Sequence, residues 1–158
     1  MRRTPPGRFI GLLTFAAAIT AAACRPAPRG GSAEAESIAI SRAVVSAPGG
    51  PMEAPAFLML DNRGAAADTL IAVASPDADS VSLHTVTAGR MEPVSSIALP
   101  AGSRVRLAPG EYHLMLKGLH RRLAIGDTVT LEFHFAAAGP VVVRAPVLRY
   151  SEAVGALR

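Results

Sequence analysis

Short stretches in which apolar and polar residues alternate follow one another along the chain from residue 38 to residue 147. Residues 128–135 show the pattern best, because every second side chain is apolar and an extended chain there has one apolar and one polar face. Turn signals rich in Gly, Pro, Asp and Asn separate the stretches, and no convincing helical period follows residue 36. The pattern predicts an all-β fold, a Greek-key β-sandwich or barrel of short antiparallel strands. The expected strands are 38–45, 56–60, 69–74, 81–86, 97–99, 104–107, 112–116, 128–135 and 140–147.

Residues 1–23 have the pattern of a signal peptide. Three arginines among the first eight residues precede an uncharged run, residues 9–23, that is short for a membrane span. The run ends in three alanines directly before Cys24, which resembles the lipobox of bacterial lipoproteins, although Ala21 stands where Leu is commoner. We therefore expect an exported protein on the periplasmic or extracytoplasmic side, lipidated at Cys24 and held to a membrane. Ordinary cleavage after an Ala-x-Ala site, leaving Cys24 as a free thiol, is the alternative.

The rest of the chain divides into three parts. Residues 24–36 are rich in Pro, Gly and Ala and lack bulky apolar side chains, so we expect a flexible tether there. Residues 37–150 are expected to form one β-sandwich domain, a monomer, followed by a C-terminal tail, 151–158. With a single cysteine in the chain, no internal disulfide can support this domain.

The charge balance gives no reason to expect binding to nucleic acid. The formal net charge is +4, from 16 basic and 12 acidic residues. Removal of the three arginines of the signal peptide leaves 13 basic residues against 12 acidic ones. A domain this close to neutral has no basic surface large enough to attract a polyanion.

The segment 111–118 places an imidazole and a thioether on one strand face. In an extended chain, Leu114 and Leu116 point one way, towards the core, and His113 and Met115 point the other. We expect this second face to be the more exposed one. A methionine there has no packing reason to be present, which makes His113 and Met115 candidate metal ligands.

A second imidazole and thioether are brought together by a predicted hairpin. Ala88 and Gly89 can form a tight turn, which places Met91 opposite Val86 on the neighbouring strand. Val86 shares a strand face with His84, so Met91 lies diagonally across from His84. Two imidazoles and two thioethers are neutral, polarizable ligands that favour Cu(I) over harder divalent ions.

These residues and their spacing resemble the PCuAC family of periplasmic copper chaperones, also written PCu(A)C. Twenty-one residues separate Met91 from His113, and His113-Leu-Met115 completes the family pattern. The flanking segments 57–62, 107–119 and 126–133 are also similar, so the resemblance covers residues 38–147. One departure is that six residues separate His84 from Met91 where the family usually has ten. An even deletion at a hairpin tip keeps both side chains on their faces.

The resemblance implies a cupredoxin-like domain that binds one Cu(I) through His84, Met91, His113 and Met115. It also implies delivery of that copper to a respiratory oxidase copper centre or to a thiol-bearing assembly protein. Two alternatives are a copper-sequestering or resistance lipoprotein with the same site, and a structural β-sandwich in which Met91 and Met115 only fill space. Met52 lies in a Pro- and Gly-rich loop and is not assigned as a ligand, although a mobile loop could bring it to an exposed site. Catalysis is not expected, because the histidines lack an accompanying nucleophile motif, carboxylate pair or phosphate loop.

Overall fold

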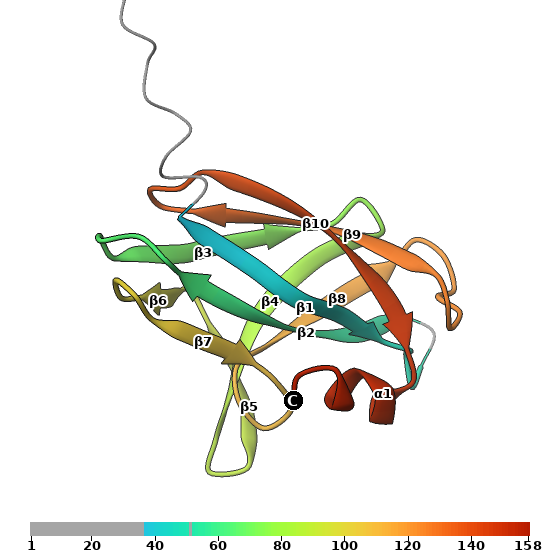
Figure 1. Cartoon of the computed structure of the whole chain (residues 1–158). Coiled ribbons are helices and arrows are strands. Elements are labelled where there is room, and N and C mark those ends of the chain that lie inside the picture. Colours follow the sequence, from blue (N-terminus) through green and yellow to red (C-terminus); the bar gives the residue numbers. More distant parts are fainter. Residues whose placement is uncertain (1–36, 51) are drawn as a thin grey trace, which may run out of the picture.

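The computed structural model of the chain describes residues 37–50 and 52–158 (Figure 1). This part contains ten strands and one short helix, and the predicted all-β fold is confirmed. The predicted signal peptide, the tether and Cys24 lie outside the described residues. The elements are β1 (Ile38–Ser46), β2 (Glu53–Asn62), β3 (Asp68–Ala74), β4 (Ala78–Thr87), β5 (Arg90–Val94), β6 (Ile97–Leu99), β7 (Arg104–Leu107), β8 (His113–Leu119), β9 (Thr128–Phe135), β10 (Pro140–Leu148) and α1 (Tyr150–Gly155).

Seven of the strands form a closed barrel. Their order is β4, β8, β2, β1, β10, β9 and β3, and the pairing of Val73 on β3 with Val81 on β4 closes the ring. Neighbouring strands are antiparallel except for β1 and β10, which run parallel. The β4–β5 hairpin projects from the barrel at the bottom of Figure 1. Closure leaves few unpaired strand edges, which limits edge-to-edge association.

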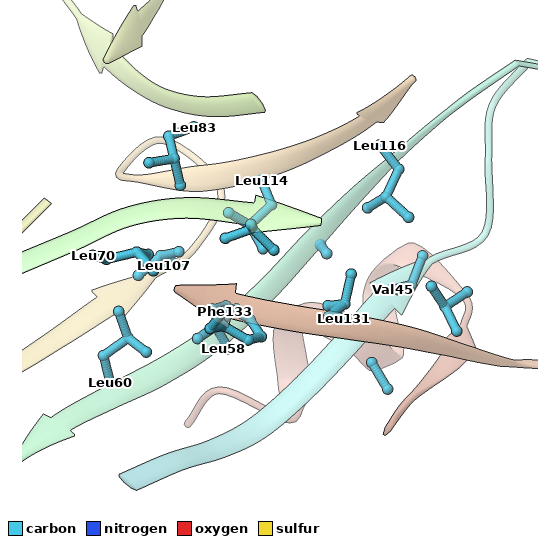
Figure 2. Packing of buried hydrophobic residues seen from close by; sticks show 14 of the residues in the cluster. Val45, Leu58, Leu60, Leu70, Leu83, Leu107, Leu114, Leu116, Leu131 and Phe133 are labelled. Carbon is cyan, nitrogen blue, oxygen red and sulfur yellow. The ribbon is translucent and has the colours of Figure 1, made fainter. Parts of the chain in front are cut away.

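The barrel interior is filled by the apolar faces that the alternation predicts. Leu114 and Leu116 of β8 are fully buried and lie with Leu83, Leu131 and Phe133 among the labelled core side chains of Figure 2. Burial of each such side chain stabilises the fold by about 1.5–3 kcal/mol relative to exposure. Because these leucines point inward, the alternate residues of the same strands must point outward.

The C-terminal residues are packed onto the barrel, whereas the sequence suggested only a tail. Helix α1 contributes the fully buried Ala153, and Leu157 just after it is also buried. They contact Val44, Phe57 and Ala108 in a second apolar cluster outside the main core. A six-residue helix is too short to show a helical period, which explains why the sequence did not predict it.

The chain joins the barrel at the end remote from the β4–β5 hairpin (Figure 1). Ile38, the first residue of β1, pairs with Asn62, the last residue of β2. The Asn62 amide donates to the carbonyls of Ala66 and Leu99, at 2.8 and 2.9 Å, and so ties this end of the barrel together. Among the described residues, no helix has the length and apolar character needed to cross a membrane.

Candidate metal centre

The outward face of β4, β8 and β2 carries its side chains in three rows, because these strands pair in antiparallel register. The first row brings His84 of β4 directly opposite His113 of β8. The next two rows each contain one residue from each strand: they are Ser82, Met115 and Pro55, and then Ser80, Lys117 and Glu53. Two imidazoles and one thioether predicted as ligands therefore share one patch of sheet.

The two imidazole rings are stacked and buried. Their centroids are 5.7 Å apart and their planes are inclined by 22°. His84 is 8% exposed and His113 is 3% exposed, so the expectation that this face is open to solvent is wrong for the imidazoles. For His113 the cover comes from Phe57, Pro109 and Tyr150, which lie in distant parts of the sequence and line the same cleft.

The backbone sets the proton position on His113. Its Nδ1 lies 3.0 Å from the carbonyl oxygen of Glu111, and since a carbonyl can only accept, Nδ1 carries the hydrogen. Nε2 is then left with a free lone pair. This nitrogen is buried and has no hydrogen-bond partner. A histidine held in this way, with one nitrogen donating and the other bare, is prepared to bind a metal ion.

The Ser82 hydroxyl is the hydrogen-bond partner of the His84 ring. The Ser82 hydroxyl donates to the carbonyl of Met115 at 3.4 Å, which leaves its oxygen free to accept from His84 Nε2 at 2.8 Å. In this arrangement the hydrogen of His84 is on Nε2, and the buried Nδ1, which has no hydrogen-bond partner, has a free lone pair. Burial lowers the pKa of His84, and the positive charge of Lys117 lowers it further, with His113 acting in the same direction and Glu53 against it. These effects favour the neutral ring, the form in which imidazole binds a metal ion.

Both predicted thioethers line one cleft together with His113, whereas His84, the fourth predicted ligand, is not among the residues that line it. Met115 is half-buried on β8, while Met91 on β5 is 53% exposed, so the two sulfurs differ in their access to solvent. The cleft has a volume of about 310 Å³, and apolar side chains form most of its wall. Its lining residues are Pro55, Phe57, Val86, Met91, Pro109, Gly110, His113, Met115 and Tyr150.

The β4–β5 hairpin has the register that the sequence predicted. Met91 pairs with Val86, and Thr87 pairs with Arg90 across a two-residue turn. Ala88 and Gly89 in the turn have φ angles of 51° and 76°, the left-handed pair of a type I′ turn. The shortened hairpin thus keeps Met91 at the rim of the cleft.

Several residues that shape the site were not found from the sequence. Ser82 stands two residues before His84 on the same strand face, and this spacing could have identified it as a hydrogen-bond partner. Phe57 and Tyr150 carry no such signal, because they meet edge to face, 6.4 Å apart, only after the chain has folded. Met52 lines an adjoining hollow that Met115 also lines. Met52 is therefore near the site but outside the main cleft.

Comparisons with known proteins identify a family and several relatives of this chain. Residues 18–147 match the family model described as "Putative lipoprotein LpqE-like". The "Putative lipoprotein Lxx21020" of Leifsonia xyli subsp. xyli is 38% identical over 127 residues, which are 76% of this chain and 75% of that protein.

Solved structures with a similar fold carry copper in their names. The copper-bound PCuAC domain from PmoF2 superposes with a TM-score of 0.64 at 31% identity, over 72% of this chain and 93% of that domain. The Cu(I) form of DR1885 from Deinococcus radiodurans has a TM-score of 0.59 at 28% identity, over 70% of this chain and 76% of that protein. The chain therefore belongs to the LpqE-like family and carries a PCuAC-type domain.

Proposed function

We propose that the domain binds one Cu(I) ion through His84 Nδ1, His113 Nε2 and the sulfurs of Met115 and Met91. The observation that carries the proposal is the pair of buried imidazole nitrogens without partners, next to a cleft that contains two thioethers. A buried polar atom without a partner costs about 1–3 kcal/mol, and coordination of an ion would remove that cost.

The donor set suits the monovalent ion. Imidazole nitrogen and thioether sulfur are neutral, and the polarizable sulfur favours a soft ion such as Cu(I). The mostly apolar cleft wall supplies few competing donors. Methionine, unlike cysteine, is not lost to disulfide formation outside the cytoplasm. The two copper-containing structures support the proposal by their names.

We infer further that the protein is a chaperone that transfers its copper and does not consume it in catalysis. Met91 lies at the exposed rim of the cleft, so an incoming ligand can replace its sulfur before the buried imidazoles dissociate from the ion. The acceptor would be a respiratory oxidase copper centre or a thiol-bearing assembly protein, as the family resemblance implies. Lipidation at Cys24 would hold the exported domain close to such membrane partners.

Anaerobic competition against a Cu(I) chelator tests binding. The protein should take up one equivalent tightly, and the His113→Ala, Met115→Ala double variant should lose that binding. X-ray absorption of the Cu(I)-loaded protein should count both nitrogen and sulfur neighbours. Weak or non-stoichiometric uptake, or binding that survives the double substitution, contradicts the proposal.

A deletion strain separates delivery from storage. Loss of oxidase activity that added copper restores is expected for a chaperone. Copper sensitivity with normal oxidase activity would instead identify a sequestering lipoprotein with the same site.

A further inference from the structure

Lys117 is the charged residue of β8 closest in sequence to the proposed ligands. It follows Met115 by two residues on the same strand face, so its Cα lies about 6.6 Å from that of Met115. Its row also contains Ser80 of β4 and Glu53 of β2. The cleft lining itself includes no Lys, Arg, Asp or Glu among the described residues.

The strand order determines which charge acts on the site. His84 is on β4, Lys117 on β8 and Glu53 on β2, and these three strands lie side by side in that order. Glu53 is therefore one strand further from His84 than Lys117 is. Because the row of Lys117 and Glu53 lies four strand residues from the row of His84, this adds only about 2 Å to the Cα–Cα distance. The carboxylate reduces the field of the ammonium group at His84 without cancelling it, since Lys117 lowers the pKa of His84 more than Glu53 raises it.

We propose that the ammonium group of Lys117 selects against divalent ions at the copper site. The inference rests on the proposed function, because it assigns a property to that same ligand set. Coulomb repulsion is proportional to the charge of the ion, so a fixed positive charge weakens binding of a divalent ion twice as much, in free energy, as binding of a monovalent one.

The expected size follows from the separation. For an ammonium group roughly 9 Å from the ion in a largely solvated setting, removal of the charge should raise the affinity about threefold for a monovalent ion and about tenfold for a divalent ion. The logarithm of the second factor is about twice that of the first. This relation distinguishes a charge effect from a general change in the site.

The experiment compares Lys117→Gln with the unaltered protein, using Cu(I) and Zn(II) as probes. Chelator competition under anaerobic conditions gives the Cu(I) affinity, and a titration followed by the histidine NMR signals gives the Zn(II) affinity. Gln is chosen because Met would add a thioether. Two variants are the controls. Lys117→Arg keeps the charge. Arg144→Gln removes a charge on β10, which lies three places from β8 in the sheet order.

We expect Lys117→Gln to bind Cu(I) about threefold and Zn(II) about tenfold more tightly at low salt, with both gains smaller at high salt. Both controls should behave like the unaltered protein. Equal gains for the two ions, no gain, or an equal effect of Arg144→Gln would overturn the role of Lys117 while leaving copper binding intact. Failure of the unaltered protein to bind Cu(I) would instead overturn the proposed function.

Discussion

The rings of His84 and His113 face each other across neighbouring strands, and each has one nitrogen in a hydrogen bond and one without a partner. The paired nitrogens are held by Ser82 and by the carbonyl of Glu111. Buried polar atoms in folded proteins are nearly always satisfied, so two bare nitrogens beside each other are unusual. They are the observation on which the proposed ion site rests.

Substitution of Ser82 should weaken Cu(I) binding although Ser82 is not a ligand. Without its hydroxyl, His84 can carry its hydrogen on Nδ1, the nitrogen proposed to bind the ion. Loss of such a supporting partner typically reduces metal affinity about 10–100-fold, and we expect Ser82→Ala to fall in that range by chelator competition. Ser80→Ala, on the same strand face two residues earlier, should retain the original affinity. An unchanged affinity in Ser82→Ala would show that the hydroxyl does not orient the ring.

The two methionines should contribute unequally. Met115 is half-buried within the sheet and Met91 is 53% exposed on the projecting hairpin, so Met115 is the better restrained ligand. We expect Met115→Leu to lower the Cu(I) affinity by at least tenfold more than Met91→Leu does. We also expect Met91→Leu to reduce the rate of copper transfer to an acceptor chelator by a smaller factor than it reduces the Cu(I) affinity. Met59→Leu, on the far part of β2, should change neither quantity. Equal losses from both substitutions would contradict this order.

Stability should depend on the ionisation of Asp68. Burial alone would raise the pKa of Asp68, but backbone N–H groups of Ala137, Ala138 and Thr69 donate to its carboxylate and bring the pKa below its ordinary value of 3.8. The folded state therefore favours the charged form. This contribution is complete above the ordinary value and is lost as the pH falls through the lowered value.

Asp68→Asn should accordingly lower the free energy of unfolding by about 1–2 kcal/mol at pH 7. The difference from the unaltered protein should shrink as the pH falls below the ordinary value of 3.8 and through the lowered pKa, because Asp68 is then protonated in the folded protein too. Urea unfolding at a series of pH values measures both effects. A difference in the free energy of unfolding that stays constant down to pH 2 would mean that the charge of Asp68 does not stabilise the fold.

The hairpin turn offers a stabilising substitution. Ala88 has a φ angle of 51°, a conformation that costs a residue with a Cβ atom about 1–2 kcal/mol relative to glycine. Asn tolerates this region and Asn-Gly is the preferred type I′ pair, so Ala88→Asn should raise the free energy of unfolding by about 0.5–1 kcal/mol. Ala101→Asn, in a turn where only the following Gly102 has a positive φ, should give no gain. A lower urea midpoint for Ala88→Asn would refute the expectation.

The C-terminal helix should stabilise the domain measurably. Leu157 is 6% exposed and packs against the small cluster around Phe57. Leu157→Ala should lower the free energy of unfolding by about 2 kcal/mol, the low end for a buried leucine because the cluster lies at the surface. Val154→Ala, at a less buried position within helix α1, should cost less. Equal stability of Leu157→Ala and the unaltered protein would show that the helix is only loosely attached.

Much of the sheet could be predicted from the sequence, because alternation is a direct consequence of burying one strand face. The expected strands 97–99, 104–107 and 128–135 have the same bounds as β6, β7 and β9. The pairing of Met91 with Val86 was also predictable, since a two-residue turn determines the register of its hairpin. The shared face of His113 and Met115 followed from strand parity alone.

The surroundings of the site could not be predicted in the same way. Alternation states on which face His113 lies but not what covers that face. The cover comes from Phe57 on β2, Pro109 in a loop and Tyr150 in α1, which are brought together only by closure of the barrel and docking of the helix. For this reason a ligand expected at an open surface is 3% exposed.

The position of Ile38 separates the point at which the domain would be attached to a lipid anchor from the copper cleft. Its partner Asn62 and the site residue Pro55 are at opposite ends of β2, and the seven residue steps of extended strand from one to the other correspond to roughly 23 Å. A domain anchored through the segment before Ile38 would therefore carry its cleft at the end away from its attachment point. Copper would then be exchanged at that far end, and the expected flexible tether would leave the domain free to turn it towards a membrane partner.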